Sequence, residues 1–153
     1  MVLILEGPDG AGKSMLAKKL EAQTGYKLIC KSYPRTEEEK TLMVGTYLQD
    51  LKSAKNIIFD RAWYSDMVYG PVMRGETPIT YPIMYELERK VAQQGGILIY
   101  CTAPWQELWR RCQLRGEEYI KDEAIFKRIC EEYNRLMHVP HHVPVVKYVY
   151  DDL

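Results

Sequence analysis

The chain has 153 residues, 46% of them hydrophobic, and its 21 Lys and Arg residues balance 21 Asp and Glu residues. This length and composition fit one globular domain with a sizeable core and argue against disorder. Zero net charge argues against a protein that grips long nucleic acid electrostatically, and no apolar run is long enough to cross a bilayer. We therefore expect a single domain over residues 1–153.

The N-terminus and the cysteines indicate where the protein works. The first residues have no basic segment or cleavage site and run directly into a glycine-rich loop, so the cytosol is the expected compartment. The cysteines lack the paired spacing of a zinc site, and we interpret them as reduced, mostly buried thiols. They are Cys30, Cys101, Cys112 and Cys130.

Apolar runs that are typical of buried strands alternate with longer amphipathic stretches that are typical of helices. In chain order we predict strand 2–6, helix 13–24, strand 27–31, helix 36–52, strand 56–60, helix 64–72, helix 81–94, strand 97–102, helix 104–114, helix 122–137 and strand 145–150. This alternation predicts an α/β fold in which a five-stranded parallel sheet carries helices on both faces. Ligands of such sheets bind beyond the carboxyl ends of the strands.

A phosphate-binding loop follows the first predicted strand and opens the first predicted helix. It fits the pattern G-x-x-x-x-G-K-[ST] with Gly7, Pro8, Asp9, Gly10, Ala11, Gly12, Lys13 and Ser14. Glycines let successive backbone N–H groups point inward at phosphates, Lys13 places a positive charge on them, and the Ser14 hydroxyl can ligate Mg²⁺. The loop predicts a P-loop NTPase fold that binds ATP and Mg²⁺.

A second functional dipeptide follows the predicted strand 56–60. Asp60 ends that strand, where an acid can hold the Mg²⁺ shell, and Arg61 beside it can clamp a phosphate with its planar fork. Lys31, Arg35 and Arg61 all follow strands, and together they could neutralise a dianionic acceptor phosphate.

Two segments of the chain resemble the thymidylate kinase family. Residues 5–14 (LEGPDGAGKS) look like its E-G-x-D-G-x-G-K-[ST] loop, and residues 60–69 (DRAWYSDMVY) are similar to its D-R-x-x-x-S-x-x-x-Y pattern. A weaker similarity joins residues 33–35 (YPR) with 45–49 (GTYLQ) to the phosphate-binding arginine segment of that family. The resemblance reaches to about Met137.

The resemblance implies roles for individual residues. Asp9 would contact the sugar 3′-hydroxyl of the acceptor, and Arg35 and Arg61 would hold its 5′-phosphate. Ser65 and Tyr69 would line the acceptor pocket. A short lid around residues 111–121 would close over the transferring phosphate, with Arg111 and Arg115, one helical turn apart, as its arginines. Thymidylate kinases are commonly dimers, which leaves a homodimer open.

One departure from that family concerns the base. The helix that reads thymine in typical members is missing, because only residues 50–55 separate the segment around Tyr47 (residues 45–49) from the strand that ends at Asp60. An aromatic cluster that includes Trp63 and Tyr69 could contact the base instead.

The expected function is a kinase for small nucleotides. It would transfer the γ-phosphate of Mg-ATP to a deoxynucleoside monophosphate such as dTMP, dUMP or a related pyrimidine. A deoxynucleoside kinase would need a carboxylate base after the second strand, where this chain has Lys31, Tyr33 and Arg35. A kinase acting on DNA or a polynucleotide end, and a nucleotide-binding switch without transferase activity, remain alternatives.

Overall fold

The computed structural model describes residues 1–32, 36–116 and 120–150. Five parallel strands form one sheet with the order β2-β3-β1-β4-β5. The strands are β1 (Val2–Glu6), β2 (Lys27–Cys30), β3 (Ile57–Asp60), β4 (Gly96–Thr102) and β5 (Val145–Val149). Each lies within one or two residues of its predicted range, and the predicted α/β fold is confirmed.

The helices also follow the predicted order. They are α1 (Lys13–Thr24), α2 (Glu37–Ser53), α3 (Trp63–Tyr69), α4 (Tyr81–Gln93), α5 (Trp105–Arg115) and α6 (Glu123–Met137). The predicted helix 64–72 differs in form, because α3 continues from Gly70 to Arg74 as a π-helical turn, η1. Thr36 and Asp122 cap the N-termini of α2 and α6 by accepting hydrogen bonds from backbone N–H groups.

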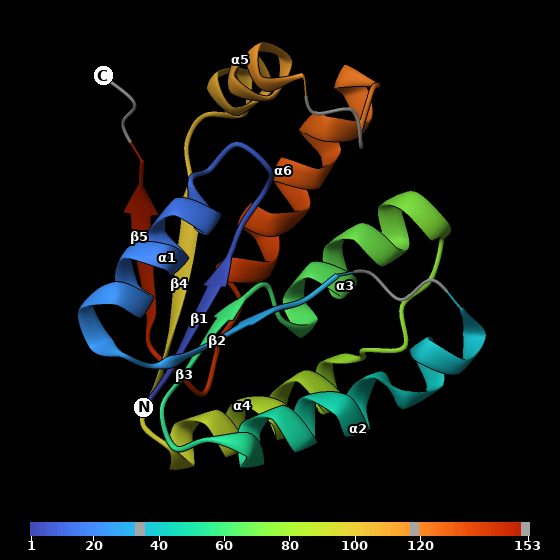
Figure 1. The fold of residues 1–153 in the computed structure, drawn as a ribbon. Helices are drawn as coiled ribbons and strands as arrows, with labels where there is room; N and C mark the ends of the chain where they lie inside the picture. The colour runs from blue at the N-terminus through green and yellow to red at the C-terminus, as the bar shows by residue number, and fades with distance from the viewer. Residues whose placement is uncertain (33–35, 117–119, 151–153) are drawn as a thin grey trace.

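The helices cover both faces of the sheet (Figure 1). Helix α1 packs on β1, β2 and β3, while α4 packs on β4, α2 packs on α4, and α3 and α5 both contact α6. Strand β1 lies at the centre of the sheet, and its Val2, Ile4 and Leu5 are fully buried. A central strand buried on both faces explains the continuous apolar run at the start of the sequence.

The carboxyl ends of the strands meet at one edge of the sheet. Leu5 of β1 pairs with Asp60 of β3, and Glu6 pairs with Tyr100 of β4. On the other side of β3, Cys30 of β2 also pairs with Asp60. Because the strands are parallel and in this register, the phosphate loop, the Asp60–Arg61 dipeptide and the residues after β2 all emerge together.

Within the described ranges, no helix is both long and apolar enough to span a membrane. All four cysteines are free, with Cys30 exposed and the other three buried. The exposed Cys30 lies at the carboxyl edge of β2, beside the cavities described below.

Candidate active site

The phosphate loop bends sharply between β1 and α1, and two of its glycines are required by neighbouring groups. Gly7 and Gly12 have φ angles of 149° and 78°. A side chain on Gly7 would overlap the carbonyl oxygen of Cys101 on β4, and a Cβ on Gly12 would lie 2.8 Å from the ring of Tyr150. The loop can therefore pass this close to β4 and to the residue after β5 only with glycine at both positions.

Lys13 is held in the concavity of this loop. Its side chain is buried, and Nζ donates a hydrogen bond to the carbonyl of Pro8 at 2.7 Å. Burial, with repulsion from the Arg61 guanidinium as a smaller cause, lowers the pKa of Lys13 to about 8. Bound phosphates would favour the charged form, because an anion within a few ångströms opposes both effects.

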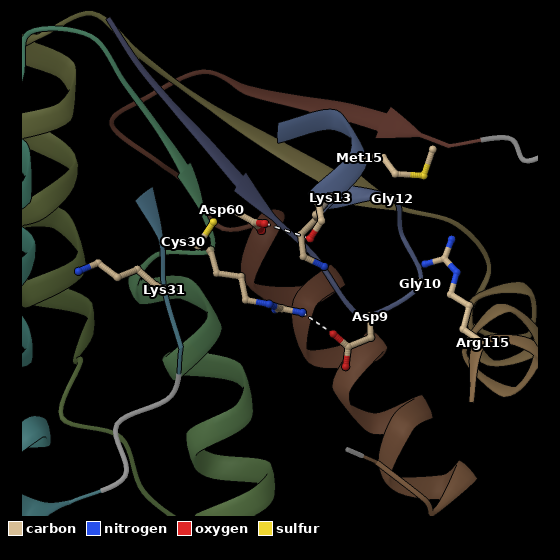
Figure 2. Close-up of a pocket in the computed structure, with 11 residues that line it drawn as sticks. Asp9, Gly10, Gly12, Lys13, Met15, Cys30, Lys31, Asp60 and Arg115 are labelled. Atoms are coloured by element: carbon tan, nitrogen blue, oxygen red, sulfur yellow. Dashed lines mark hydrogen bonds and ion pairs between the residues drawn. The ribbon is translucent and has the colours of Figure 1, made fainter. Parts of the chain in front are cut away.

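Ser14 and Asp60 bring two oxygen ligands together at the mouth of the loop. The Ser14 hydroxyl donates a hydrogen bond to Oδ2 of Asp60 at 3.1 Å. Figure 2 marks this bond with the dashed line that starts at Asp60. A hydroxyl and a carboxylate at this distance fit Mg²⁺, which prefers a few oxygen ligands and keeps several waters.

Arg61 lies between the phosphate loop and a second cavity. Its backbone is left-handed, with a φ angle of 70°, and its backbone N–H donates a hydrogen bond to the carbonyl oxygen of Leu5 at 3.0 Å. Left-handed backbone is uncommon for a residue with a Cβ, and such residues cluster at functional sites. Its Nη2 donates to Oδ1 of Asp9 at 2.6 Å, which Figure 2 marks, and Nη1 lies 3.2 Å from the carbonyl oxygen of Gly7.

Three adjoining cavities surround these groups and share Lys31 as a wall residue. The donor cavity, of about 260 Å³, is lined by residues of the phosphate loop together with Met15, Cys30, Asp60, Arg61 and Arg115. The acceptor cavity, of about 250 Å³, is lined by Ser32, Met43, Tyr47, Arg61, Ala62, Ser65 and Asp66. A groove of about 410 Å³ continues from it along α2, past Glu39, Leu42 and Thr46.

Most of the predicted loop and phosphate-binding residues line these cavities or form the loop beside them. Asp9, Gly10, Gly12, Lys13, Ser14, Asp60, Arg61 and Arg115 line the donor cavity. Gly7 and Ala11 belong to the same loop, and Ser65 lines the acceptor cavity. Arg35 and residues 117–119 of the predicted lid lie outside the described residues.

The placement of four predicted site residues differs from their expected roles: Lys31, Trp63, Tyr69 and Arg111. Lys31 points away from the phosphate loop (Figure 2), because its Nζ pairs with Asp50 and lies 5.1 Å from the ring centroid of Tyr47. Trp63 is fully buried and packs against the rings of Tyr47 and Phe59. Its prediction as a base contact is therefore not supported by its placement.

Tyr69 and Arg111 support other site residues. Tyr69 is fully buried, and its ring lies 5.3 Å from the Arg61 guanidinium carbon. Arg111 is buried, and it donates to the carbonyl oxygens of Gly10 at 3.2 Å and Tyr150 at 2.8 Å. These contacts join the phosphate loop to the end of β5, whereas the prediction gave Arg111 a lid role. Of the two predicted lid arginines, Arg115 is the one that lines the donor cavity.

Sequence reasoning missed four residues of this site. Met43 and Tyr47 wall the acceptor cavity from α2, but a Met and a Tyr at helical spacing read as ordinary core. Glu6 is a fully buried acid in an otherwise apolar strand, which is a signal that could have been followed. Tyr133 reaches Arg61 from α6 at 3.0 Å, across 72 residues of sequence, and nothing local marks it.

Comparison with known proteins agrees with this geometry. Residues 1–123 match the family model for polyphosphate kinase 2 (PPK2). The SPbeta prophage-derived uncharacterized protein YorR of Bacillus subtilis (strain 168) is 29% identical over 136 residues, which are 89% of this chain and 81% of YorR. The crystal structure of YorR in complex with phosphorylated GDP superposes with a TM-score of 0.82 at 25% identity, covering 97% of this chain and 85% of YorR.

More distant solved structures share the fold. The deoxyadenosine kinase of M. mycoides with bound dATP gives a TM-score of 0.67 at 20% identity over 99% of this chain and 93% of the kinase. Polyphosphate kinase 2 from Arthrobacter aurescens TC1 gives 0.69 at 20% identity over 95% of this chain and 59% of that protein. The fold, the phosphate loop and the match over residues 1–123 together show that this chain belongs to the polyphosphate kinase 2 family and is a P-loop nucleotide kinase.

Proposed function

We propose that this kinase transfers the γ-phosphoryl group of Mg-ATP to the 5′-phosphate of a nucleoside monophosphate, with dTMP, dUMP or a related pyrimidine deoxynucleotide as the expected acceptor. The observation that carries this proposal is the position of Arg61. Its guanidinium contacts the phosphate loop at Gly7 and Asp9 and also lines both the donor and the acceptor cavity. A planar, always-charged group between two phosphate sites suits a reaction that joins two anions.

The donor phosphates would lie in the loop. Lys13 and the loop N–H groups would neutralise their charge, and Arg115, which lines the same cavity, would add a further positive charge. Ser14 and Asp60 would hold Mg²⁺, which would supply positive charge to offset the charge that develops on the leaving group. We propose that residues 1–153 form one kinase domain and that a lid around 111–121 brings Arg115 over the transferring group.

The acceptor base would occupy the cavity between α2 and α3. Met43 and Tyr47 provide an apolar wall there, and Asp66 provides a polar floor that Arg74 holds by an ion pair of 2.6 Å. With the base in this cavity, the 5′-phosphate would face Arg61 and the phosphate loop. Asp9, which contacts the same guanidinium, would be placed for the sugar hydroxyl.

A phosphorylated acceptor fits the chemistry better than a nucleoside. In the transfer, an acceptor phosphate oxygen forms a bond to the γ-phosphorus while the bond to the β–γ bridging oxygen breaks and ADP leaves. An acceptor phosphate is already an anion, so no general base is needed, whereas a nucleoside hydroxyl must lose a proton. The residues that directly follow β2 are Lys31 and Ser32 rather than a carboxylate. The carboxylates of Glu6, Asp9 and Asp60, at the loop and at the end of β3, are already hydrogen-bonded to other groups of the protein.

A relative, YorR, was solved with phosphorylated GDP at an identity of 25% to this chain. A guanine nucleotide in that relative makes guanosine and deoxyguanosine monophosphates necessary members of any acceptor panel. Family membership likewise makes inorganic polyphosphate a phosphoryl donor to compare with ATP.

The test is an ADP-release assay with Mg-ATP against nucleosides, (deoxy)nucleoside monophosphates and a short oligonucleotide. We expect turnover to be stimulated by a monophosphate and not by the matching nucleoside, and to fall by at least 10²-fold in Arg61→Gln. Stimulation by nucleosides or oligonucleotide alone would overturn the monophosphate assignment. A parallel series with polyphosphate in place of ATP separates the two donors.

A further inference from the structure

A fully buried carboxylate, which directly precedes the phosphate loop, supports the turn that carries Arg61. Glu6, the last residue of β1, is completely buried. Its Oε1 accepts from the backbone N–H groups of Ala62 at 2.6 Å and Ser65 at 3.1 Å. Because backbone amides can only donate, Oε1 must be an acceptor, and the carboxylate fixes the turn in which Arg61 adopts its left-handed conformation.

The second oxygen of this carboxylate accepts from two hydroxyl groups. Oε2 of Glu6 lies 2.7 Å from the Ser65 hydroxyl and 3.1 Å from the Tyr133 hydroxyl. Nη1 of Arg61 lies 3.1 Å from the same Ser65 oxygen and 3.0 Å from the same Tyr133 oxygen. Each hydroxyl can therefore accept from the guanidinium and donate to the carboxylate at the same time.

This arrangement joins the Arg61 guanidinium to the buried Glu6 carboxylate through two hydroxyl groups. A chain of donors that runs from a guanidinium through hydroxyls to a carboxylate is polarised in one direction, which strengthens each hydrogen bond in it. Tyr133 contributes from α6, where it is fully buried and its ring centroid lies 5.9 Å from that of Tyr69. Tyr69 in turn lies 5.3 Å from the guanidinium carbon of Arg61.

We propose that Tyr133 is a positioning residue, which together with Ser65 bridges Arg61 to the buried Glu6 carboxylate and fixes the guanidinium between the phosphate loop and the acceptor cavity. This inference rests on the proposed function only in taking Arg61 as the group that meets the acceptor phosphate. Tyr133 itself lines none of the three cavities described above, so it acts through Arg61 and not on substrate.

The first test is Tyr133→Phe, which removes only the hydroxyl. Without this hydroxyl the Arg61 guanidinium loses one hydrogen-bond partner and becomes more mobile. Because catalysis depends on the position of that group, we expect kcat to fall about ten-fold and acceptor KM to rise, with ATP KM unchanged. Tyr64→Phe is the matched control, because Tyr64 is equally buried and also donates to a buried acid, Glu88, at 2.5 Å. That control should lower the melting temperature and leave the steady-state constants as they are.

A double-mutant cycle separates positioning from a general structural effect. If Tyr133 acts through Arg61, Tyr133→Phe should weaken acceptor binding about five-fold in the wild-type background and not at all in Arg61→Gln. An equal effect in both backgrounds would overturn the proposal. Ser65→Ala, which removes the other bridge, should resemble Tyr133→Phe.

A readout without substrate keeps this inference apart from the proposed function. The ¹H–¹⁵N NMR signal of the Arg61 side chain is assigned by its loss in Arg61→Gln. In the wild type this signal should be that of an ordered side chain. We expect it to shift and become mobile in Tyr133→Phe and to be unchanged in Tyr64→Phe. An unchanged Arg61 signal in Tyr133→Phe refutes the positioning role. If no monophosphate stimulates turnover, the proposed function fails while this spectrum still decides the role of Tyr133.

Discussion

The Asp9 carboxylate of the phosphate loop lies 2.6 Å from the Arg61 guanidinium, so the acceptor-side arginine is bound directly to the donor-side loop. Both side chains remain partly exposed to the donor cavity, at 28% for Asp9 and 15% for Arg61. In the proposed reaction, a phosphorylated acceptor that reaches Arg61 would meet a cation already held at the phosphate loop.

Replacing Asp9 with Asn should weaken catalysis less than replacing Arg61. Asp9→Asn keeps the shape of the contact but removes its charge, and Arg61 is still held by Gly7, Ser65 and Tyr133. We expect kcat/KM for the acceptor to fall about ten-fold in Asp9→Asn, against at least 10²-fold in Arg61→Gln. Steady-state kinetics with varied acceptor measure both. Asp122→Asn, at the exposed cap of α6, is a control that should leave kcat/KM unchanged.

Nucleotide affinity should decrease above neutral pH. Phosphates bind the protonated form of Lys13, and burial lowers its pKa to about 8 in the free protein. As the pH rises through that value, the free protein loses the charge, so the association constant for Mg-ATP should fall up to about ten-fold per pH unit. Titration calorimetry between about pH 6.5 and 9.5 with a non-hydrolysable analogue measures this.

The variant Lys13→Arg provides the control for that titration, because arginine stays protonated throughout. Its affinity should be lower at every pH and should not change between about pH 7 and 9. A wild-type affinity that is equally constant over this range would contradict the assignment of the pH dependence to Lys13.

The stability of the fold should depend on pH through a buried pair remote from the phosphate loop. His141 Nδ1 lies 2.5 Å from Oε2 of Glu88, and its Nε2 lies 2.9 Å from the carbonyl oxygen of Leu136. Both ring nitrogens face acceptors, so the protonated imidazole satisfies both. Burial opposes the charge, but the hydrogen bonds outweigh it and raise the pKa of His141 above its ordinary 6.5. Burial raises the pKa of the Glu88 carboxyl, but the hydrogen bonds from His141, Tyr64 and the backbone N–H of His142 outweigh it and lower that pKa below its ordinary value.

The direction of the effect follows from these two shifts. The contribution of His141 is fully present below about pH 6.5 and is lost as the pH rises through its higher folded value. The contribution of Glu88 is present above about pH 4.5 and is lost as the pH falls through its lower folded value. We expect His141→Gln to lower the unfolding free energy by about 3 kcal/mol near pH 6 and by less near pH 9. Urea unfolding across pH measures this difference, and His138→Gln, at an exposed position, should show none.

Three arginines near the end of α5 should behave differently. Arg111→Ala removes the link between Gly10 and Tyr150, so ATP KM should rise about ten-fold as the loop loosens. Arg115→Ala removes a cation from the donor cavity and should lower kcat more than it changes ATP KM. Arg110→Ala is the control, because Arg110 is half-exposed and pairs with Glu107. Identical constants for Arg110→Ala and Arg115→Ala would contradict a role for Arg115 in transfer.

The acceptor base should depend on Tyr47 rather than on Trp63. Tyr47→Ala opens the wall of the acceptor cavity, so acceptor KM should rise about ten-fold while ATP KM stays constant. Trp63→Phe changes only the core behind that wall, and it should lower the unfolding free energy by about 1–3 kcal/mol with acceptor KM unchanged. A raised acceptor KM in Trp63→Phe at normal stability would restore the predicted base contact.

Local signals in the sequence are sufficient for the fold and for the donor side of the site. Strand 2–6, the glycine loop and helix 13–24 are consecutive, so periodicity, glycine placement and the lysine that follows determine their relation within one short segment. Asp60 and Arg61 could be placed as well, because parallel strands in register bring their carboxyl ends to one edge. The resemblance to thymidylate kinases added Ser65 and Asp9 to that list, although the family that the chain matches is polyphosphate kinase 2.

Only the tertiary structure decided which side chains turn toward the site. Lys31 follows a strand as predicted, yet its ammonium group forms an ion pair with Asp50 of α2. Trp63 lies two residues after Arg61 in the sequence but is buried in the core. Tyr133 lies 72 residues from Arg61 and meets it because α6 packs against α3. Side-chain direction and long-range packing depend on which helices cover which face, and no local pattern of residues carries that information.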